Sequence, residues 1–117
     1  MLKKLLIVDD ELLVCSSLSR ALRSHFDEVF TARTPSEAEQ LLSGHAVTHL
    51  VSDCHLGADL PLGYELIEGW RDLCPSIVRA VVFSGTDLST AEMPDSVDAV
   101  VSKAAGLARL LVALEID

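Results

Sequence analysis

Acidic residues stand where two short apolar runs of the chain end. Asp9, Asp10 and Glu11 follow the run KLLIV, and Asp53 follows THLVS. Carboxylates held close together repel each other strongly unless a cation lies between them. An all-oxygen cluster without organised Cys or His suits Mg2+, which typically joins one or two carboxylates to a phosphate. The acidic residues therefore indicate a divalent cation and phosphoryl chemistry, in which a carboxylate can attack phosphorus to form an aspartyl phosphate.

Two further polar residues end apolar runs in the second half of the chain. Ser84 follows VRAVVF and Lys103 follows VDAVVS. A hydroxyl and a lysine are groups that neutralise charge on the oxygens of a transferring phosphoryl group. Taken singly, Asp10 can be a helix cap, Asp53 and Ser84 turn residues, and Lys103 a solvated surface charge. The order Asp-Asp, Asp, Ser, Lys at four run ends is more specific than any one of these residues alone.

The apolar runs also predict the elements that position these residues. Short apolar runs alternate with longer amphipathic segments, which is typical of a parallel sheet wrapped by helices. The carboxyl ends of parallel strands share one edge, and open α/β sheets bind ligands outside that edge, so we expect the polar residues to converge there. The expected strands are residues 4–8, 28–32, 48–52, 78–83 and 97–102.

Helical patterns fill the intervals between the expected strands. The second helix has the clearest start, because TPSE reads as Thr34 at the cap, Pro35 at the first helical position and Glu37 closing a capping box. The fourth helical segment, DLSTAEMPDS, is short, polar and interrupted by Pro94, so we expect a short or irregular helix there. Trp70, at helical spacing with apolar neighbours, is interpreted as a packing residue. Besides the fourth segment, the expected helices are residues 12–25, 35–44, 63–73 and 105–115.

Composition limits the classes of function. A chain of 117 residues that is 50% hydrophobic matches one compact domain, residues 1–117. A formal net charge of -9 and the lack of a Lys/Arg run argue against binding to nucleic acid or to an anionic membrane. No apolar run approaches the roughly 18 residues of a spanning helix, and the amino terminus does not read as a secretory signal. We expect a cytoplasmic protein.

Cysteine and histidine usage gives no sign of a structural metal site. Cys15, Cys54 and Cys74 are widely spaced and form no C-x-x-C pair, so we interpret them as free, buried or partly buried thiols. His45 and His49 are four residues apart, but Gly44 and β-branched residues between them make a shared helix face unfavourable.

The chain resembles receiver domains of two-component response regulators over nearly its full length. Five segments carry the resemblance: IVDDE, LVSDCHLG, GYELI, VVFSG and VVSK. The resemblance implies a flavodoxin-like, doubly wound five-stranded parallel sheet with helices on both faces. It also implies a signalling domain that promotes its own phosphorylation and dephosphorylation, rather than an enzyme acting on other substrates.

The resemblance assigns a role to each acidic residue. Asp53 would accept a phosphoryl group from the phosphohistidine of a sensor histidine kinase or a histidine phosphotransfer protein. Asp10 and Asp53 would ligate Mg2+, Asp9 would hold it through water, and the backbone carbonyl of His55 would complete the protein ligands. The output would be an unidentified partner protein or a domain outside these residues.

The resemblance is less complete in the residues that would respond to phosphorylation. Ser84 and Lys103 match the hydroxyl and the lysine that bind the phosphoryl group. The family usually has a cis proline after this lysine, whereas Ala104 stands here, and a cis bond before a non-proline residue costs about 3 kcal/mol, so we expect a trans bond. Val100 stands where the family commonly has an aromatic switch residue. Pro94 falls in the helix that receivers usually use for output.

Two other functions remain open at this stage. One is a pseudo-receiver, a protein-interaction module with the same fold and no regulated phosphorylation, which Val100 and Ala104 favour. The other is a haloacid-dehalogenase-like phosphohydrolase, whose nucleophile also follows the first strand. That family has an acid/base Asp two residues after the nucleophile, where this chain has Glu11. Asp53 would then have no role.

Overall fold

In the computed structural model, which describes residues 2–85 and 93–116, five parallel strands form one sheet with the order β2-β1-β3-β4-β5. This order is flavodoxin-like and doubly wound, as the resemblance to receiver domains implies. The strands are β1 (Lys4–Val8), β2 (Glu28–Ala32), β3 (His49–Ser52), β4 (Arg79–Ser84) and β5 (Ala99–Ser102). The helices are α1 (Leu12–Leu22), α2 (Pro35–Gly44), α3 (Gly63–Leu73) and α4 (Leu107–Ala113), with 3-10 turns η1 (Arg23–His25) and η3 (Lys103–Ala105).

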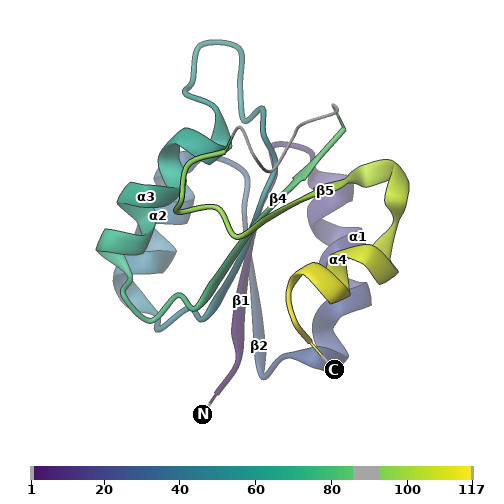
Figure 1. Cartoon of the computed structure of the whole chain (residues 1–117). Coiled ribbons are helices and arrows are strands. Elements are labelled where there is room, and N and C mark those ends of the chain that lie inside the picture. The colour runs from purple at the N-terminus through teal and green to yellow at the C-terminus, as the bar shows by residue number, and fades with distance from the viewer. Residues whose placement is uncertain (1, 86–92, 117) are drawn as a thin grey trace.

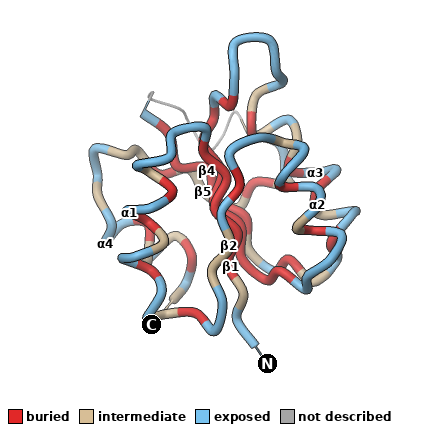
Figure 2. Tube along the Cα trace, turned by 180° about the vertical axis from the view of Figure 1, so that it is seen from behind, coloured by how far each residue is buried: buried red, intermediate tan, exposed pale blue. Residues whose placement is uncertain are grey.

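Helices cover both faces of the sheet (Figure 1). α1 and α4 lie on one side, and α2 and α3 lie on the other. In β1, Leu5 and Ile7 pack under α1 and α4, whereas Leu6 and Val8 pack under α2 and α3. Figure 2 shows that buried residues run along the strands while exposed residues lie on the outer helices and loops. Because both faces are covered, the strands read as nearly continuous apolar runs.

The single tryptophan and the thiols belong to the core. Trp70 of α3 is 2% exposed, which confirms its interpretation as a packing residue. Cys15, Cys54 and Cys74 are free and buried, as predicted. The cysteines therefore act as small apolar side chains in this fold.

Helix boundaries follow local signals. The predicted helix 12–25 is α1 followed by η1, so its last three residues tighten into a 3-10 turn. At the start of α2, the Thr34 hydroxyl accepts a hydrogen bond from the Glu37 amide (3.1 Å), which confirms the predicted cap. The Glu37 carboxylate accepts from the Arg33 amide (2.9 Å), one residue before the position of the usual capping box. No helix in the described part of the chain is long and apolar enough to cross a membrane.

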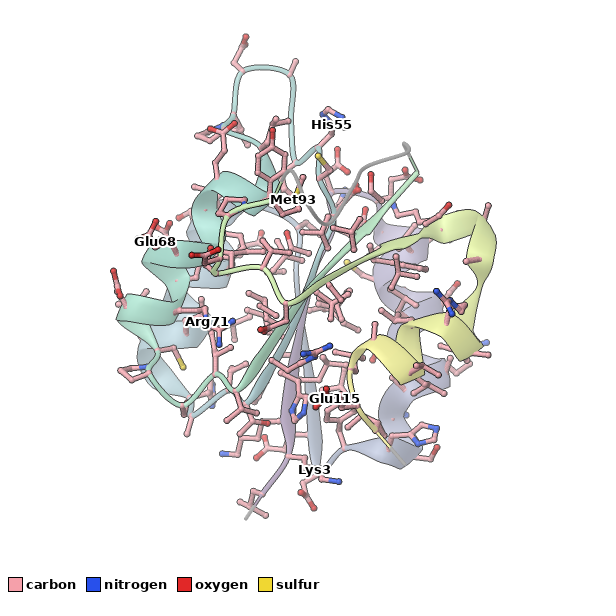
Figure 3. All side chains as sticks on the ribbon, in the orientation of Figure 1. Lys3, His55, Glu68, Arg71, Met93 and Glu115 are labelled. Carbon is pink, nitrogen blue, oxygen red and sulfur yellow. The ribbon has the colours of Figure 1, made fainter. Side chains whose placement is uncertain are left out.

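β5 begins at Ala99, two residues later than predicted. The carboxylate of Asp98 accepts hydrogen bonds from the Ala80 amide (2.7 Å) and from Nη1 of Arg71 (2.9 Å). Because the Ala80 amide binds this side chain, the regular ladder starts only after Asp98. Nη1 of Arg71 also donates to the Ser96 carbonyl (2.8 Å), so α3 is tied to the segment that enters β5; Arg71 is labelled in Figure 3.

Part of the fourth helical segment falls outside the described residues. The expectation of a short or irregular helix concerns residues 87–96, of which 87–92 are not described. Residues 93–96 form a bend and a turn, closed by a hydrogen bond from the Val97 amide to the Pro94 carbonyl (3.0 Å). Residues 93–96 are therefore irregular, and the rest of the expectation stays a prediction.

Candidate metal centre

Strand register brings two carboxylates side by side at the carboxyl edge of the sheet. Val8 of β1 is paired with Ser52 of β3, so the residues that follow them, Asp9 and Asp53, are neighbours. The Asp53 amide donates to the Val8 carbonyl (2.8 Å), which continues the pairing by one residue. Asp9 is 2% exposed and Asp53 is 8% exposed. The sheet therefore holds two nearly buried carboxylates at adjacent positions.

Asp10 completes a cluster of three carboxylates. Each of Asp9, Asp10 and Asp53 offers an oxygen, and these oxygens lie within 4.8 Å of one another. This donor set is all oxygen, combines two buried groups with one exposed group, and fits a hard divalent cation such as Mg2+. The alternative reading of Asp10 as a helix cap is wrong, because α1 is capped at Glu11 without a side-chain hydrogen bond. The Glu11 amide binds the Asp9 carboxylate instead (2.9 Å).

Lys103 reaches this cluster from the end of β5. Its Nζ lies 2.9 Å from Oδ2 of Asp9 and 3.5 Å from Oδ2 of Asp53. The described residues contain no cis peptide bond, so the bond to Ala104 is trans, as predicted. The Ala104 amide donates to the Ser102 hydroxyl (3.2 Å), which fixes the turn after the strand. A trans peptide therefore places the lysine in the site, where its closest carboxylate is that of Asp9.

Charge is unbalanced in this cluster. Burial raises the pKa of Asp53, and the neighbouring charge of Asp9 raises it further, while Lys103 and the Cys54 amide have smaller opposite effects. Burial by itself would lower the pKa of Lys103, but the hydrogen bond to Asp9 and the charge of Asp53 outweigh it, so the pKa is raised. Lys103 therefore stays an ammonium, and the carboxylates still lack positive charge that a divalent cation can supply.

Backbone contacts hold Asp53 in place. Its Oδ1 accepts a hydrogen bond from the Cys54 amide (2.8 Å), and the Ser52 hydroxyl donates to the Asp53 carbonyl (2.9 Å). The Gly63 amide, at the start of α3, donates to the Cys54 carbonyl (2.6 Å). A side chain at Gly63 would collide with the Asp53 carbonyl oxygen. The absence of a Cβ there lets α3 begin directly against the carboxylate-bearing backbone.

Ser52 and Gly63 were not predicted as site residues. Ser52 reads in the sequence as the end of a buried strand, and its hydrogen bond to a neighbouring carbonyl leaves no sequence pattern. Gly63 is one of six glycines in the sequence, and nothing in its sequence surroundings marks the contact with the Asp53 carbonyl.

The other predicted residues lie on adjoining elements. Ser84 is 1% exposed at the end of β4, in register with Ser102, the residue before Lys103. Val100 is partly buried and packs against the core under α2 and α3. The side chain of His55 is exposed at the start of the loop after β3 (Figure 3). The structure thus brings Ser84 to the same sheet edge, whereas Val100 is a packing residue.

His45 and His49, which are four residues apart in the sequence, do not belong to the carboxylate cluster. His45 follows α2 in an extended conformation, and its ring stacks at a tilt on Phe30 with centroids 4.4 Å apart. His49 begins β3, and its Nδ1 lies 2.8 Å from the Thr48 hydroxyl. The two imidazoles therefore do not share a helix face.

Comparisons with known proteins find similar solved structures but no matching family model or curated sequence. A response regulator protein from Burkholderia pseudomallei, described with a phosphorylated aspartic acid, calcium ion and citrate, superposes with a TM-score of 0.81 at 29% identity. That match covers 96% of this chain and 66% of the other, so this chain spans just under two thirds of that protein's length.

Two further solved structures align over nearly their whole length. A response regulator receiver domain protein from Methanospirillum hungatei has a TM-score of 0.82 and 24% identity, covering 98% of this chain and 92% of its own. A response regulator protein from Thermotoga maritima in complex with Mg2+ and BeF has a TM-score of 0.81 and 18% identity, covering 97% and 96%. At these identities the likeness is one of fold.

Proposed function

We propose that this chain, whose structural neighbours are response regulator receiver domains, is the phosphoacceptor receiver of a two-component signalling system. It would take a phosphoryl group from the phosphohistidine of a sensor histidine kinase or a histidine phosphotransfer protein onto Asp53. The observation that carries the proposal is the cluster of three carboxylate oxygens within 4.8 Å, with Lys103 Nζ 2.9 Å from Asp9. The proposal places the chain in the cytoplasm, as a signalling domain and not a classical enzyme.

The two oxygens of Asp53 have different roles in this proposal. Oδ1 accepts a hydrogen bond from the Cys54 amide, and this bond orients the carboxylate. In the transfer, a carboxylate oxygen attacks phosphorus, the phosphorus–nitrogen bond to the donor imidazole breaks, and the electron pair returns to the imidazole. Lys103, 3.5 Å from Oδ2, lies where it can neutralise the phosphoryl oxygens. Asp10 and Asp53 would ligate Mg2+ and Asp9 would hold it through water, and the metal would supply further positive charge when bound.

Three residues complete the proposed site. The backbone carbonyl of His55 would be the remaining protein ligand of the metal, and the hydroxyl of Ser84 would donate to a phosphoryl oxygen. Phosphorylation would then favour one arrangement of the loops that follow β4 and β5, as a population shift. Val100 carries no ring, so this shift would pass through Ser84 and Lys103. The output is a partner protein or a domain outside this chain.

Two of the structural neighbours support the proposed chemistry. The Burkholderia protein is described with a phosphorylated aspartic acid and calcium, and the Thermotoga protein with Mg2+ and BeF. The first is 29% identical to this chain. Phosphorylation of Asp53 and binding of Mg2+ by the carboxylate cluster are the corresponding proposals here.

Intact mass spectrometry tests this proposal directly. The protein is incubated with acetyl phosphate and Mg2+, beside the Asp53→Asn variant and a sample with EDTA. We expect a gain of about 80 Da, one phosphoryl group in place of a hydrogen, in the wild type only. An adduct that persists in Asp53→Asn would place the acceptor elsewhere.

A pseudo-receiver is the second candidate. It is favoured by Val100, which is partly buried and packs against the core, and by Ala104 in place of the family's proline. Absence of any adduct, also with a phosphohistidine donor and at short times, would establish this alternative. The phosphohydrolase alternative has less support, because Glu11 is exposed and its amide, rather than its carboxylate, contacts Asp9. Turnover of a simple phosphomonoester with Mg2+ would be needed to revive it.

A further inference from the structure

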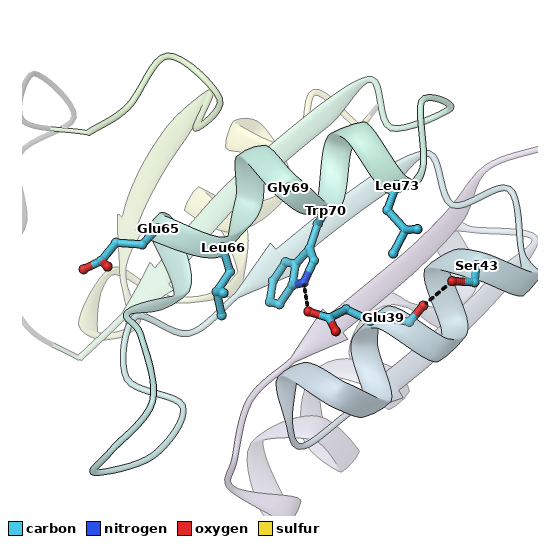
Figure 4. Close-up of a pocket in the computed structure, with 7 residues that line it drawn as sticks. All are labelled: Glu39, Ser43, Glu65, Leu66, Gly69, Trp70 and Leu73. Atoms are coloured by element: carbon cyan, nitrogen blue, oxygen red, sulfur yellow. Dashed lines mark hydrogen bonds between the residues drawn. The ribbon is translucent and has the colours of Figure 1, made fainter.

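A groove of about 520 Å³ runs between α2 and α3, and none of the site residues described above lines it. α2 packs against α3 on this side of the sheet. The helices are 10 and 11 residues long, so the groove is at most about 15 Å long. Figure 4 shows the side chains that line it: Glu39, Ser43, Glu65, Leu66, Gly69, Trp70 and Leu73.

The base of the groove is apolar and fixed. The Trp70 indole is 2% exposed, and its Nε1 donates a hydrogen bond to the Glu39 carboxylate (3.3 Å) from the opposite helix. Leu66 is half-buried, and Leu73 is 44% exposed, which is high for a leucine facing a groove. Below the groove, apolar side chains of both helices belong to one core cluster, and the hydrogen bond between Trp70 and Glu39 also links the two helices.

No contact within the described part of the chain requires a glycine at position 69. Gly69 lies in the interior of α3, where glycine costs about 1 kcal/mol of stability relative to alanine. Its φ is not positive, and a Cβ there would meet no atom within 4 Å in the described part of the chain. Gly63 of the same helix is required by the Asp53 carbonyl, but no such contact exists at Gly69. The space at Gly69 therefore suits close approach by a group from outside the chain.

The charge on the groove restricts what can occupy it. Glu39 and Glu65 line it, none of the described lining residues is basic, and Glu68 and Asp72 are exposed on the same helix. A second copy of this chain would bring its own acidic groove and a net charge of -9, which disfavours groove-to-groove dimers. A cationic segment with an apolar stripe complements both the rim and the base.

We propose that the α2–α3 groove docks a helical segment of a partner protein, with Lys or Arg residues flanking an apolar stripe that packs closely over Gly69. Glu39 and Glu65 would pair with the basic residues, and Leu66, Trp70 and Leu73 would contact the stripe. The groove is separate from the carboxylate cluster, so this inference does not depend on phosphorylation of Asp53.

A fluorescence titration of the unphosphorylated chain tests the groove. Trp70 is the only tryptophan, so its emission reports on the groove directly. The probe is a synthetic Lys/Leu amphipathic peptide of about 14 residues, roughly four helical turns, without Trp or Tyr. We expect a saturable change in Trp70 emission. In the Gly69→Leu variant, which fills the groove, we expect affinity to fall by about tenfold or more.

Gly69→Leu should fold, because a Cβ there has open space and leucine is a better helix former than glycine. Thermal unfolding of this variant at or above the wild-type midpoint keeps a loss of binding attributable to the groove. The pair Glu39→Gln with Glu65→Gln should weaken binding by about tenfold. The pair Glu28→Gln with Glu115→Gln removes the same charge elsewhere and should change affinity by less than about twofold.

Three results would overturn the proposal. They are no saturable emission change, equal affinity of Gly69→Leu and wild type, and equal weakening by the two charge-matched pairs. The last result would mean that the peptide is attracted by net charge alone. Self-association of the wild type that Gly69→Leu abolishes would assign the groove to a second copy of the chain.

Discussion

The carboxyl edge of the sheet has two halves that are built differently. The acceptor half, named for the function proposed for Asp53, lies at the ends of β1 and β3 and holds the carboxylates Asp9, Asp10 and Asp53. The response half, named for the proposed switching role, holds Ser84, Lys103 and Ala104 at the ends of β4 and β5, together with Val100 inside β5. β1 and β3 are adjacent and lie inside the sheet, so backbone pairing fixes the acceptor half. β5 is an edge strand, and the response half reaches the cluster through one long side chain.

This difference indicates which half tolerates change. In the acceptor half, each carboxylate position follows from a register that a whole sheet maintains, and even a methyl group at Gly63 meets backbone. In the response half, Nζ of Lys103 reaches Asp9 (2.9 Å) across a trans peptide bond to Ala104. A flexible side chain can compensate for a change in backbone, whereas a paired strand cannot.

Gly63→Ala tests the rigidity of the acceptor half and should have the largest effect. The new Cβ would overlap the Asp53 carbonyl, so α3 must shift away from the site. We expect a loss of about 3 kcal/mol in the free energy of unfolding, measured by urea denaturation, together with slower phosphoryl acceptance. Gly44→Ala is the matched control, because a Cβ there has open space and should leave stability within about 0.5 kcal/mol. Equal stability of the two variants would contradict a rigid acceptor half.

Lys103→Met tests whether the response half acts on the acceptor half. Removal of the ammonium 2.9 Å from Asp9 leaves more negative charge for a cation, so Mg2+ should bind about tenfold more tightly by calorimetry. Phosphorylation by acetyl phosphate should slow by about 100-fold, because one charge-stabilising group is lost. Lys4→Met is the control, because it removes a lysine at the amino end of β1, where Lys4 pairs with Glu28. Unchanged Mg2+ affinity and rate in Lys103→Met would make the lysine a bystander.

Val100→Ala tests whether this position still takes part in switching. Val100 is partly buried against the core under α2 and α3, so the substitution should cost about 1 kcal/mol. Because the residue has no ring to move, we expect the same cost in the phosphorylated and unphosphorylated forms, measured by thermal unfolding with and without the phosphoryl donor. A cost that differs between the two forms would show that Val100 belongs to the switch.

The same two halves explain how much the sequence could predict. β1 and β2 have the predicted bounds, whereas β3 begins one residue later than predicted and β4 is shifted by one residue toward the carboxyl terminus. The convergence of Asp9, Asp10 and Asp53 was predicted because the carboxyl ends of parallel strands share one edge of the sheet. The preference of Lys103 for Asp9 and the contact of Gly63 with Asp53 could not be predicted, because they depend on where long side chains and loop backbones lie in three dimensions.

The late start of β5 shows a tertiary contact that outweighs the local sequence pattern. The run VDAVVS predicts a strand from Val97, but the Asp98 carboxylate accepts hydrogen bonds from the Ala80 amide and from the Arg71 guanidinium. A side chain that competes for a ladder amide cannot be recognised from apolar character. This boundary lies in the response half, where tertiary contacts matter more than strand pairing.

His49, at the amino end of β3, offers the smallest and most specific test, because the same strand carries Asp53 at its carboxyl end. Burial lowers the pKa of His49, and the charges of Lys3 and Arg79 lower it further. The folded-state pKa therefore lies below the unfolded value of about 6.5, and between these two values the unfolded chain binds more protons. The wild type should lose stability relative to His49→Gln as the pH falls through about 6.5, measured by urea denaturation between pH 7.5 and 5.

Phosphoryl acceptance at pH 7.5 should be the same in His49→Gln and the wild type, because the imidazole is already neutral there and binds the Thr48 hydroxyl rather than the carboxylates. Parallel stability curves for the two proteins would mean that His49 can be protonated in the folded state without cost. A change in acceptance would mean that the amino end of β3 is coupled to its carboxyl end, and that the acceptor half is less rigid than its register implies.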